Sequence, residues 1–235
     1  MAIVCSSWCT INMGTSGRHV THAGGNDREY VIQANCMASR MCLLVMAVEV
    51  MGGTWVVEQP SSSLLRFYPR VMDTFSMFRV TWATRWWMGH YHSKTPKRHI
   101  AWSNSKEIGL LNMGKLRGWQ YHSEEYQKHK TATTTVSKNG KKSFQGRKKQ
   151  LKASQTYPYR FGLRMVRILP RLLATGCKDV GEPPADFDAL TCFRLQEYDD
   201  LWEDACMLDV LKYIYGNRSL KIPVEWRGHL LPSQP

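Results

Sequence analysis

The apolar run Trp55-Val56-Val57 limits the possible folds more than any other stretch, because it ends abruptly in Glu58 and is followed by Pro60. Short runs that are apolar at every residue are typical of strands buried on both faces, as in the middle of a parallel α/β sheet. Ligands of such sheets bind just beyond the carboxyl ends of the strands. Glu58 is therefore either an acid that faces a ligand or a solvated strand-end residue that caps a helix beginning near Ser61.

A helix is predicted over about residues 27 to 51, directly before this strand. Asn26-Asp27-Arg28-Glu29 resembles a capping box, in which a cap residue is followed three positions later by Glu. Apolar residues then recur at helical spacing as far as Val48, and Gly52-Gly53 is expected to stop the helix. The helix, the glycine pair and the buried strand together predict an αβ unit of a doubly wound sheet.

Further motifs lie on both sides of this unit in a fixed order. They are the cysteine loop Val4-Cys5-Ser6-Ser7-Trp8, the segment Gly14-Thr15-Ser16-Gly17-Arg18, the strand end Glu58-Gln59-Pro60, Tyr91-His92 with Lys97 through Asn104, and the step Tyr157-Pro158. In these motifs, residues 3 to 173 resemble the catalytic half of a C5-cytosine DNA methyltransferase, or one of that family's small, divergent relatives. The resemblance implies an α/β fold with a Rossmann-like methyltransferase sheet and a β-hairpin.

The chain also departs from the family pattern. Family members begin with a strand and a glycine-rich turn that holds S-adenosylmethionine, and no such turn precedes Cys5. Val4 stands in place of the family's proline, Gln59 in place of asparagine, and Arg98-His99 in place of Pro-Thr. The resemblance therefore predicts a methyltransferase sheet truncated at its N-terminus. It implies S-adenosylmethionine as the cofactor, with a separate chain as one possible source of the missing cofactor half.

The resemblance implies catalytic roles for Cys5 and Glu58. In the related enzymes a cysteine thiolate adds to C6 of cytosine, which makes C5 able to attack a methyl sulfonium. A carboxyl group at the strand end assists by protonating N3 of the ring, and the base must first leave the duplex. The alternative for Cys5 is a small hydrophobic residue buried in a strand. Cys9 is the second candidate for the nucleophile.

The charge of the chain favours a polyanionic partner. It carries 32 Lys and Arg against 19 Asp and Glu, a net charge of +13. Residues 115–152 hold eleven of the bases, interleaved with aromatic residues and opposed only by Glu124 and Glu125: Lys115, Arg117, Lys128, Lys130, Lys138, Lys141, Lys142, Arg147, Lys148, Lys149 and Lys152. Basic stretches with aromatics are typical of proteins that follow a nucleic-acid backbone and stack on its bases.

We therefore predict a nucleic-acid partner, which the resemblance implies to be DNA. The predicted contact residues are Lys97, Arg98, Lys141, Lys142, Arg147, Lys148 and Lys149. The alternative for residues 115–152 is a solvated, lysine-rich insertion.

Beyond about residue 178 the sign of the charge reverses, with ten acids between 179 and 209. Gly181-Glu182-Pro183-Pro184 is typical of a linker, and residues 199–215 have the apolar spacing of a helix. We predict three parts: an α/β domain over 1–175, a linker over 176–184, and an acidic helical appendage over 185–235. The appendage either completes the core or docks on the basic surface or a partner.

Seven cysteines at irregular spacing predict free thiols in a reducing, intracellular compartment. The spacing of Cys5, Cys9, His19 and His22 misses that of zinc sites, so no metal is predicted. The longest apolar run, Met41 to Val48, is too short to span a bilayer, so no membrane partner is predicted.

Three functions remain open: a DNA-modifying enzyme, an inactive or partial relative that binds nucleic acid, and an unrelated basic interaction protein.

Overall fold

The computed structural model of the chain describes residues 7–78, 80–116, 128–140 and 142–176. Residues 177–235, which hold the predicted acidic appendage and nearly all of the predicted linker, lie outside this part, as do Cys5 and Lys141. The structural statements below concern the described residues.

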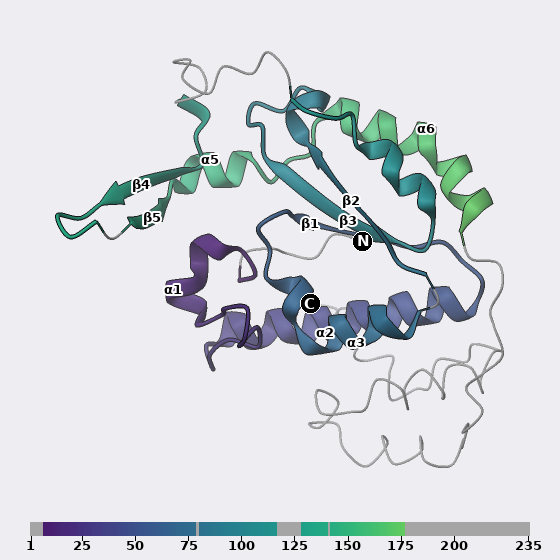
Figure 1. Cartoon of the computed structure of the whole chain (residues 1–235), viewed down its shortest axis with the longest axis horizontal. Coiled ribbons are helices and arrows are strands. Elements are labelled where there is room, and N and C mark those ends of the chain that lie inside the picture. The colour runs from purple at the N-terminus through teal and green to yellow at the C-terminus, as the bar shows by residue number, and fades with distance from the viewer. Residues whose placement is uncertain (1–6, 79, 117–127, 141, 177–235) are drawn as a thin grey trace, which may run out of the picture.

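A three-stranded antiparallel sheet lies at the centre of the described structure (Figure 1). Its strands are β1 (Val56–Pro60), β2 (Trp82–Trp87) and β3 (Arg98–Ser103), in the order β1-β3-β2. Ser103 of β3 pairs with Val56 of β1 on one side and with Trp82 of β2 on the other. Because both neighbours run antiparallel to β3, strands β1 and β2 are parallel to each other. Helix α3 (Pro69–Met77) lies between them in the chain.

Helices cover both faces of this sheet (Figure 1). Helices α2 (Glu29–Val50) and α3 lie on one face, and α6 (Tyr159–Thr175) lies on the other with the 3-10 turns η3 (Met88–Tyr91) and η4 (Lys106–Leu111). Successive side chains of a strand point to opposite faces. Ile100 and Trp102 of β3 accordingly pack in the α2 core, whereas Ala101 packs in the α6 core.

The α/β class is confirmed, but every strand pair in the described residues is antiparallel. The run before Glu58 is predicted to lie in the middle of a parallel sheet, whereas β1 is the outer strand of the described sheet. Glu58 is the middle residue of β1, not its last one. The run is apolar because helices cover both faces, and this burial needs no parallel neighbours.

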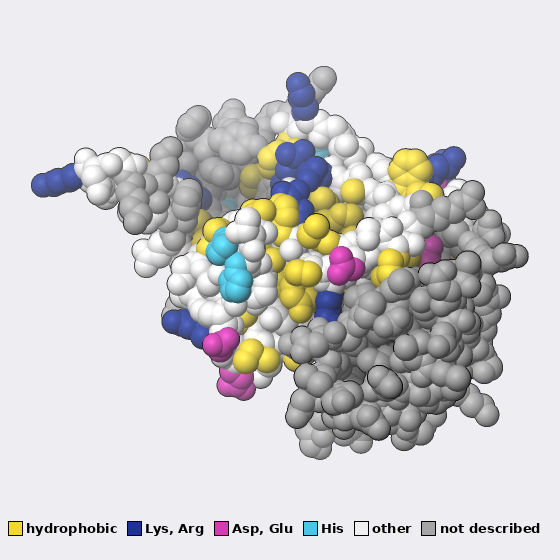
Figure 2. Space-filling view, turned by 60° about the horizontal axis from the view of Figure 1, so that its bottom comes forward, with side chains coloured by type: hydrophobic (Ala, Val, Ile, Leu, Met, Phe, Trp, Pro, Cys, Tyr) yellow, Lys and Arg dark blue, Asp and Glu magenta, His cyan; other side chains and the backbone are white. Residues whose placement is uncertain are grey.

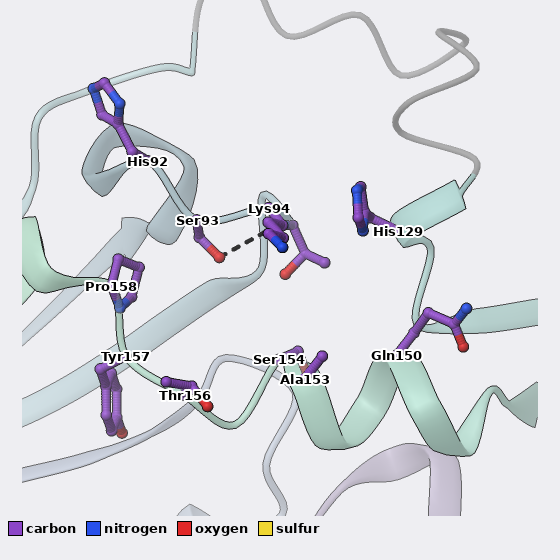
Figure 3. Close-up of a pocket in the computed structure, with 11 residues that line it drawn as sticks. His92, Ser93, Lys94, His129, Gln150, Ala153, Ser154, Thr156, Tyr157 and Pro158 are labelled. Atoms are coloured by element: carbon purple, nitrogen blue, oxygen red, sulfur yellow. Dashed lines mark hydrogen bonds between the residues drawn. The ribbon is translucent and has the colours of Figure 1, made fainter.

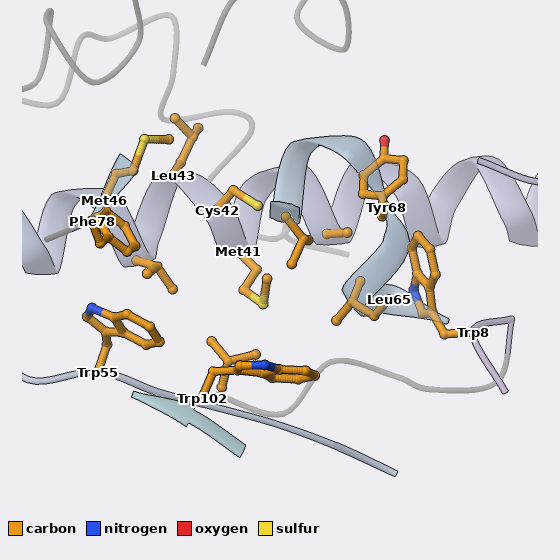
Figure 4. Packing of buried hydrophobic residues seen from close by; sticks show 14 of the residues in the cluster. Trp8, Met41, Cys42, Leu43, Met46, Trp55, Leu65, Tyr68, Phe78 and Trp102 are labelled. Carbon is orange, nitrogen blue, oxygen red and sulfur yellow. The ribbon is translucent and has the colours of Figure 1, made fainter. Parts of the chain in front are cut away.

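The predicted helix over 27 to 51 is confirmed as α2. Gly52, with φ of 66°, follows its C-terminus, as the glycine pair predicts. The predicted capping box is wrong: the N-cap residue Arg28 makes no side-chain cap, and the amide of Asn26 donates to the Thr15 carbonyl at 3.0 Å. The length and mean hydropathy of α2 would also allow it to cross a membrane. In the structure α2 packs along the sheet, where Met41 points toward Trp102 (Figure 4).

The remaining elements are short. The turns η1 (Thr10–Asn12) and η2 (Leu65–Phe67) and the helix α1 (Met13–Ser16) lie around the ends of α2 and β1. Strands β4 (Ala132–Val136) and β5 (Lys142–Gly146) form a hairpin that projects from the body, and α5 (Lys148–Ala153) follows it (Figure 1).

Arg18 is buried and holds the N-terminal loops together. Only 1% of it is exposed, and its guanidinium carbon lies 3.5 Å from the centre of the Trp8 indole ring. Burial lowers its pKa to about 10, so it stays charged at neutral pH. The guanidinium donates to neutral oxygens: the carbonyls of Ala23, Gly24 and Val31, Oδ1 of Asn35 and Oγ of Ser7.

Replacing Arg18 by Met should therefore lower the free energy of unfolding by about 3 kcal/mol, because several buried oxygens lose their donor. Arg28→Met, at an exposed arginine, should change it by less than about 0.5 kcal/mol. Urea unfolding of the full chain measures both values. Equal effects of the two substitutions would show that the Arg18 contacts do not stabilise the fold.

Candidate functional site

The carboxylate of Glu58 is buried on the α6 side of the sheet, where two ring side chains hold it. Its Oε1 accepts a hydrogen bond from Nδ1 of His99 on β3, and its Oε2 accepts one from the hydroxyl of Tyr157, just before α6. Glu58 is 8% exposed and His99 is 4% exposed. Glu58 pairs directly with Ala101, so His99 is its diagonal neighbour, a position from which a long side chain reaches across.

Aromatic rings surround this group. Trp86 of β2 stacks on His99, with 5.7 Å between the ring centroids, and Phe161 of α6 stacks on Trp86 at 5.8 Å. The ring of Tyr157 stacks on Phe161 at 5.3 Å. Hydrogen bonds to a charged group are stronger in such an apolar environment than in water. The arrangement can hold or pass a proton between Glu58 and His99, and Oε2 is engaged by the Tyr157 hydroxyl.

The predicted nucleophile Cys5 lies outside the described residues, but the chain just after it is placed. The backbone of Leu64 donates to the Trp8 carbonyl at 2.8 Å, and Cys9 forms an isolated antiparallel bridge with Ser63. Residues 8–9 therefore lie along the turn that follows β1. The structure brings the end of the cysteine loop next to the strand that carries Glu58.

A cavity of about 510 Å³ opens at this turn. We call it the β1 cavity. No acidic residue lines it. Its lining residues come from the N-terminal loop, from the end of β1 and start of β3, and from the hairpin base and α5: Cys9, Thr10, Ile11, Asn12, Pro60, Ser61, Ser62, Lys97, Arg98, Thr131, Leu151, Ser154 and Gln155.

Lys97 and Arg98, two of the predicted nucleic-acid contacts, thus lie together in the β1 cavity. The guanidinium carbon of Arg98 also lies 5.3 Å from the centre of the Trp87 ring. The hairpin and α5, which carry the other predicted contacts, provide the opposite wall through Thr131 and Leu151.

Each of the other predicted contacts has a definite place, apart from Lys141. Arg147 lies at the base of the hairpin, where Nη1 donates to the Lys130 carbonyl at 3.5 Å. Lys149 is exposed on α5, Lys142 is the first residue of β5, and Lys148 is the first residue of α5.

Sequence reasoning assigned no role to His99, Tyr157 or Trp86. Glu58 and Tyr157 are 99 residues apart, so no local pattern indicates their contact. The pairing of β1 with β3 would have pointed to His99, because alternation places His99 on the same face of the sheet as Glu58.

The described glycine pairs do not form a nucleotide-binding turn. The Gly24 carbonyl accepts from Arg18, and a Cβ on Gly25 would lie 2.7 Å from the Ser16 carbonyl oxygen. A Cβ on Gly53 would lie 2.9 Å from the Val48 side chain. Both pairs pack against the protein's own loops and present no cradle to S-adenosylmethionine. Neither pair therefore takes the place of the glycine-rich turn of the related enzymes, and S-adenosylmethionine as the cofactor stays a prediction.

His19 and His22 lie side by side, with 5.5 Å between their ring centroids. Among the residues that the structure describes, no group of three or more His, Cys, Asp or Glu side chains gathers there or elsewhere as metal ligands.

Comparison with known proteins found no matching family model, no matching curated protein and no matching solved structure.

The Glu58–His99 contact predicts non-additive effects on stability. His99→Leu should lower the free energy of unfolding by about 2–4 kcal/mol, because it leaves a buried carboxylate with one donor fewer. Glu58→Leu should also destabilise, since it leaves the buried Nδ1 of His99 and the hydroxyl of the half-exposed Tyr157 without their acceptor. The double variant should lose about 1–3 kcal/mol less than the sum of the two single effects. Urea unfolding of the four proteins gives this coupling; additivity within about 0.5 kcal/mol would mean that the contact contributes nothing.

Proposed function

We propose that the protein binds nucleic acid, DNA in particular, across the β1 cavity. The observation that carries this proposal is the meeting of two segments that were predicted separately as contacts. Lys97 and Arg98 form one wall of the cavity, and the hairpin base and α5 form the other. A strand lying in the cavity would touch both.

The charge of these elements supports the proposal. From residue 128 to residue 176 the chain contains no Asp or Glu, whereas it contains these bases: Lys128, Lys130, Lys138, Lys141, Lys142, Arg147, Lys148, Lys149, Lys152, Arg160, Arg164, Arg167 and Arg171. In the space-filling view, Lys and Arg side chains gather in a compact group on one face, and the Asp and Glu side chains lie outside it (Figure 2). Such a field attracts phosphates and releases their counterions.

The lining of the cavity suits a phosphate backbone. Ser61 and Ser62 offer hydroxyl donors beside Lys97 and Arg98, and side chains of these types make most contacts to DNA phosphates. Exposed aromatic rings lie close in sequence, at Tyr157 (42% exposed) and Tyr159 (80% exposed). Rings of this kind can stack on unpaired bases.

The double variant Lys97→Gln/Arg98→Gln should weaken binding to duplex DNA by a similar factor for different sequences. The slope of log K against log salt should fall by about 2, because about two phosphate contacts are lost. Arg28→Gln/Lys106→Gln is the matched control, since both side chains are exposed and neither lines the cavity. Fluorescence anisotropy over a salt series measures the slopes. An unchanged slope in the first variant would contradict the proposed site.

A second candidate function is covalent chemistry on cytosine, favoured by the place of residues 8–9 beside the strand of Glu58. The thiolate of Cys5 would bond to C6 of the base while Glu58, carrying a proton, gives that proton to N3. C5 then takes a proton from the solvent. The original C5 proton leaves to the solvent, the thiolate is expelled from C6, and N3 returns its proton to Glu58, which restores the ring. No methyl donor takes part in this exchange.

This chemistry predicts that the full chain, in deuterated water, introduces deuterium at C5 of cytosine in DNA. Cys5→Ala should abolish the exchange and leave DNA affinity unchanged, whereas Cys9→Ala should retain both. Mass spectrometry of the recovered nucleosides measures the exchange. Absence of exchange with the wild-type chain would overturn this second function and leave the nucleic-acid proposal standing.

A further inference from the structure

A second cavity, of about 400 Å³, shares Ser154 with the β1 cavity. Its walls come from three parts of the chain: the turn after η3, His129 before the hairpin, and the segment that joins α5 to α6. Figure 3 shows Ser93 and Lys94 facing Ser154 and Thr156 across it, with His129 to one side. None of the lining residues that the structure describes is acidic.

One side chain in its wall has a polar atom without a partner. Thr95 is only 9% exposed, and its Oγ1 is buried with no hydrogen-bond partner in the described part of the chain. The Thr95 backbone N–H is bonded, since it donates to Oγ of Ser93 at 3.3 Å. Leaving a buried hydroxyl unpaired costs free energy, so nearly all such groups have a partner. Because Thr95 lines the cavity, a polar ligand there is a partner that its hydroxyl could take after a small rotation of the side chain.

The turn that carries Thr95 is held in an uncommon conformation. His92 has a φ of 61°, in the left-handed region that few residues other than glycine adopt. The guanidinium of Arg160 donates to Nε2 of His92 at 2.9 Å, and this holds the ring against α6. In Figure 3 the rings of His92 and Tyr157 point away from the cavity. They shape its edge and leave the ligand to the turn residues and His129.

The chemistry of the lining selects the class of ligand. Lys94 supplies a positive charge, His129 a ring N–H, and Ser93, Ser154 and Thr156 hydroxyls. A ligand that suits these groups is negatively charged and has several acceptor oxygens. Lysine and hydroxyl groups together are common partners of phosphate. We propose that this cavity binds a phosphate group, held by the Thr95 hydroxyl, Lys94 and His129.

Titration of the full chain with inorganic phosphate, at constant ionic strength set by chloride, tests the site by calorimetry. Wild-type protein should bind phosphate saturably, and Thr95→Val and Lys94→Gln should each weaken binding about tenfold, since each removes a bond to a charged ligand. The control Lys106→Gln should bind as wild type does. The proposal would be overturned if the wild-type protein showed no saturable phosphate binding, or if Thr95→Val bound phosphate as tightly as the wild type.

Stability provides an independent check on Thr95. If Oγ1 has no protein partner, Thr95→Val removes an unpaired hydroxyl, and the urea midpoint should stay the same or rise. A lower midpoint would show that the hydroxyl has a structural partner, and this too would overturn the proposal.

Competition with DNA identifies the source of the phosphate. If duplex DNA displaces inorganic phosphate and Thr95→Val also weakens DNA binding, the cavity takes a backbone phosphate, a result that rests on the proposed function. If DNA binds without changing phosphate affinity, the ligand is a free phosphate compound. Phosphate binding without any DNA binding would sink the proposed function and leave this site intact.

Discussion

The covering of the central sheet on both faces is the constraint on which the rest of the structure depends. Strand β3 sends Ile100 and Trp102 to the α2 side and Ala101 to the α6 side, so a polar group in the middle of β3 or of β1 is covered on both faces. At one end, Asn104 donates to Glu49 and to the Gly53 carbonyl, each at 2.8 Å, and burial raises the pKa of Glu49. That network joins the end of α2 to the sheet.

The same constraint explains the geometry around Glu58. A carboxylate in the middle of a covered strand must be paired, because an isolated buried charge is very costly. His99 comes from the neighbouring strand and Tyr157 from the segment before α6, so the site exists only when the sheet and the second helix layer are both in place. Its precision therefore comes from long-range packing and not from any single motif.

Much of the local structure could be predicted from the sequence, because α2, its glycine stop and the strand before Glu58 depend on patterns within a few residues. The direction of strand pairing could not be predicted. An apolar run reports burial on two faces, and a covered antiparallel sheet buries β1 as a parallel one would. The capping box was wrong because Oδ1 of Asn26 accepts from the backbone of Arg28, two residues on, and not from Glu29. Thr95 and His129 line the same cavity although they lie in separate segments of the chain. No local sequence pattern indicates that they are neighbours in space.

The distribution of charge distinguishes the buried Glu58 site from the two basic cavities. Glu107 is drawn into an ion pair with Arg171 at 3.1 Å, and both oxygens of Glu58 are engaged by ring donors. Among the residues that the structure describes, no carboxylate lines either cavity, and both cavities contain lysine. A polyanion can therefore approach the segment around Tyr157 from either cavity without meeting an exposed acid among those lining residues. The carboxylate of Glu58 lies behind that segment with both oxygens bonded, so it belongs to the interior of the fold and not to the basic surface.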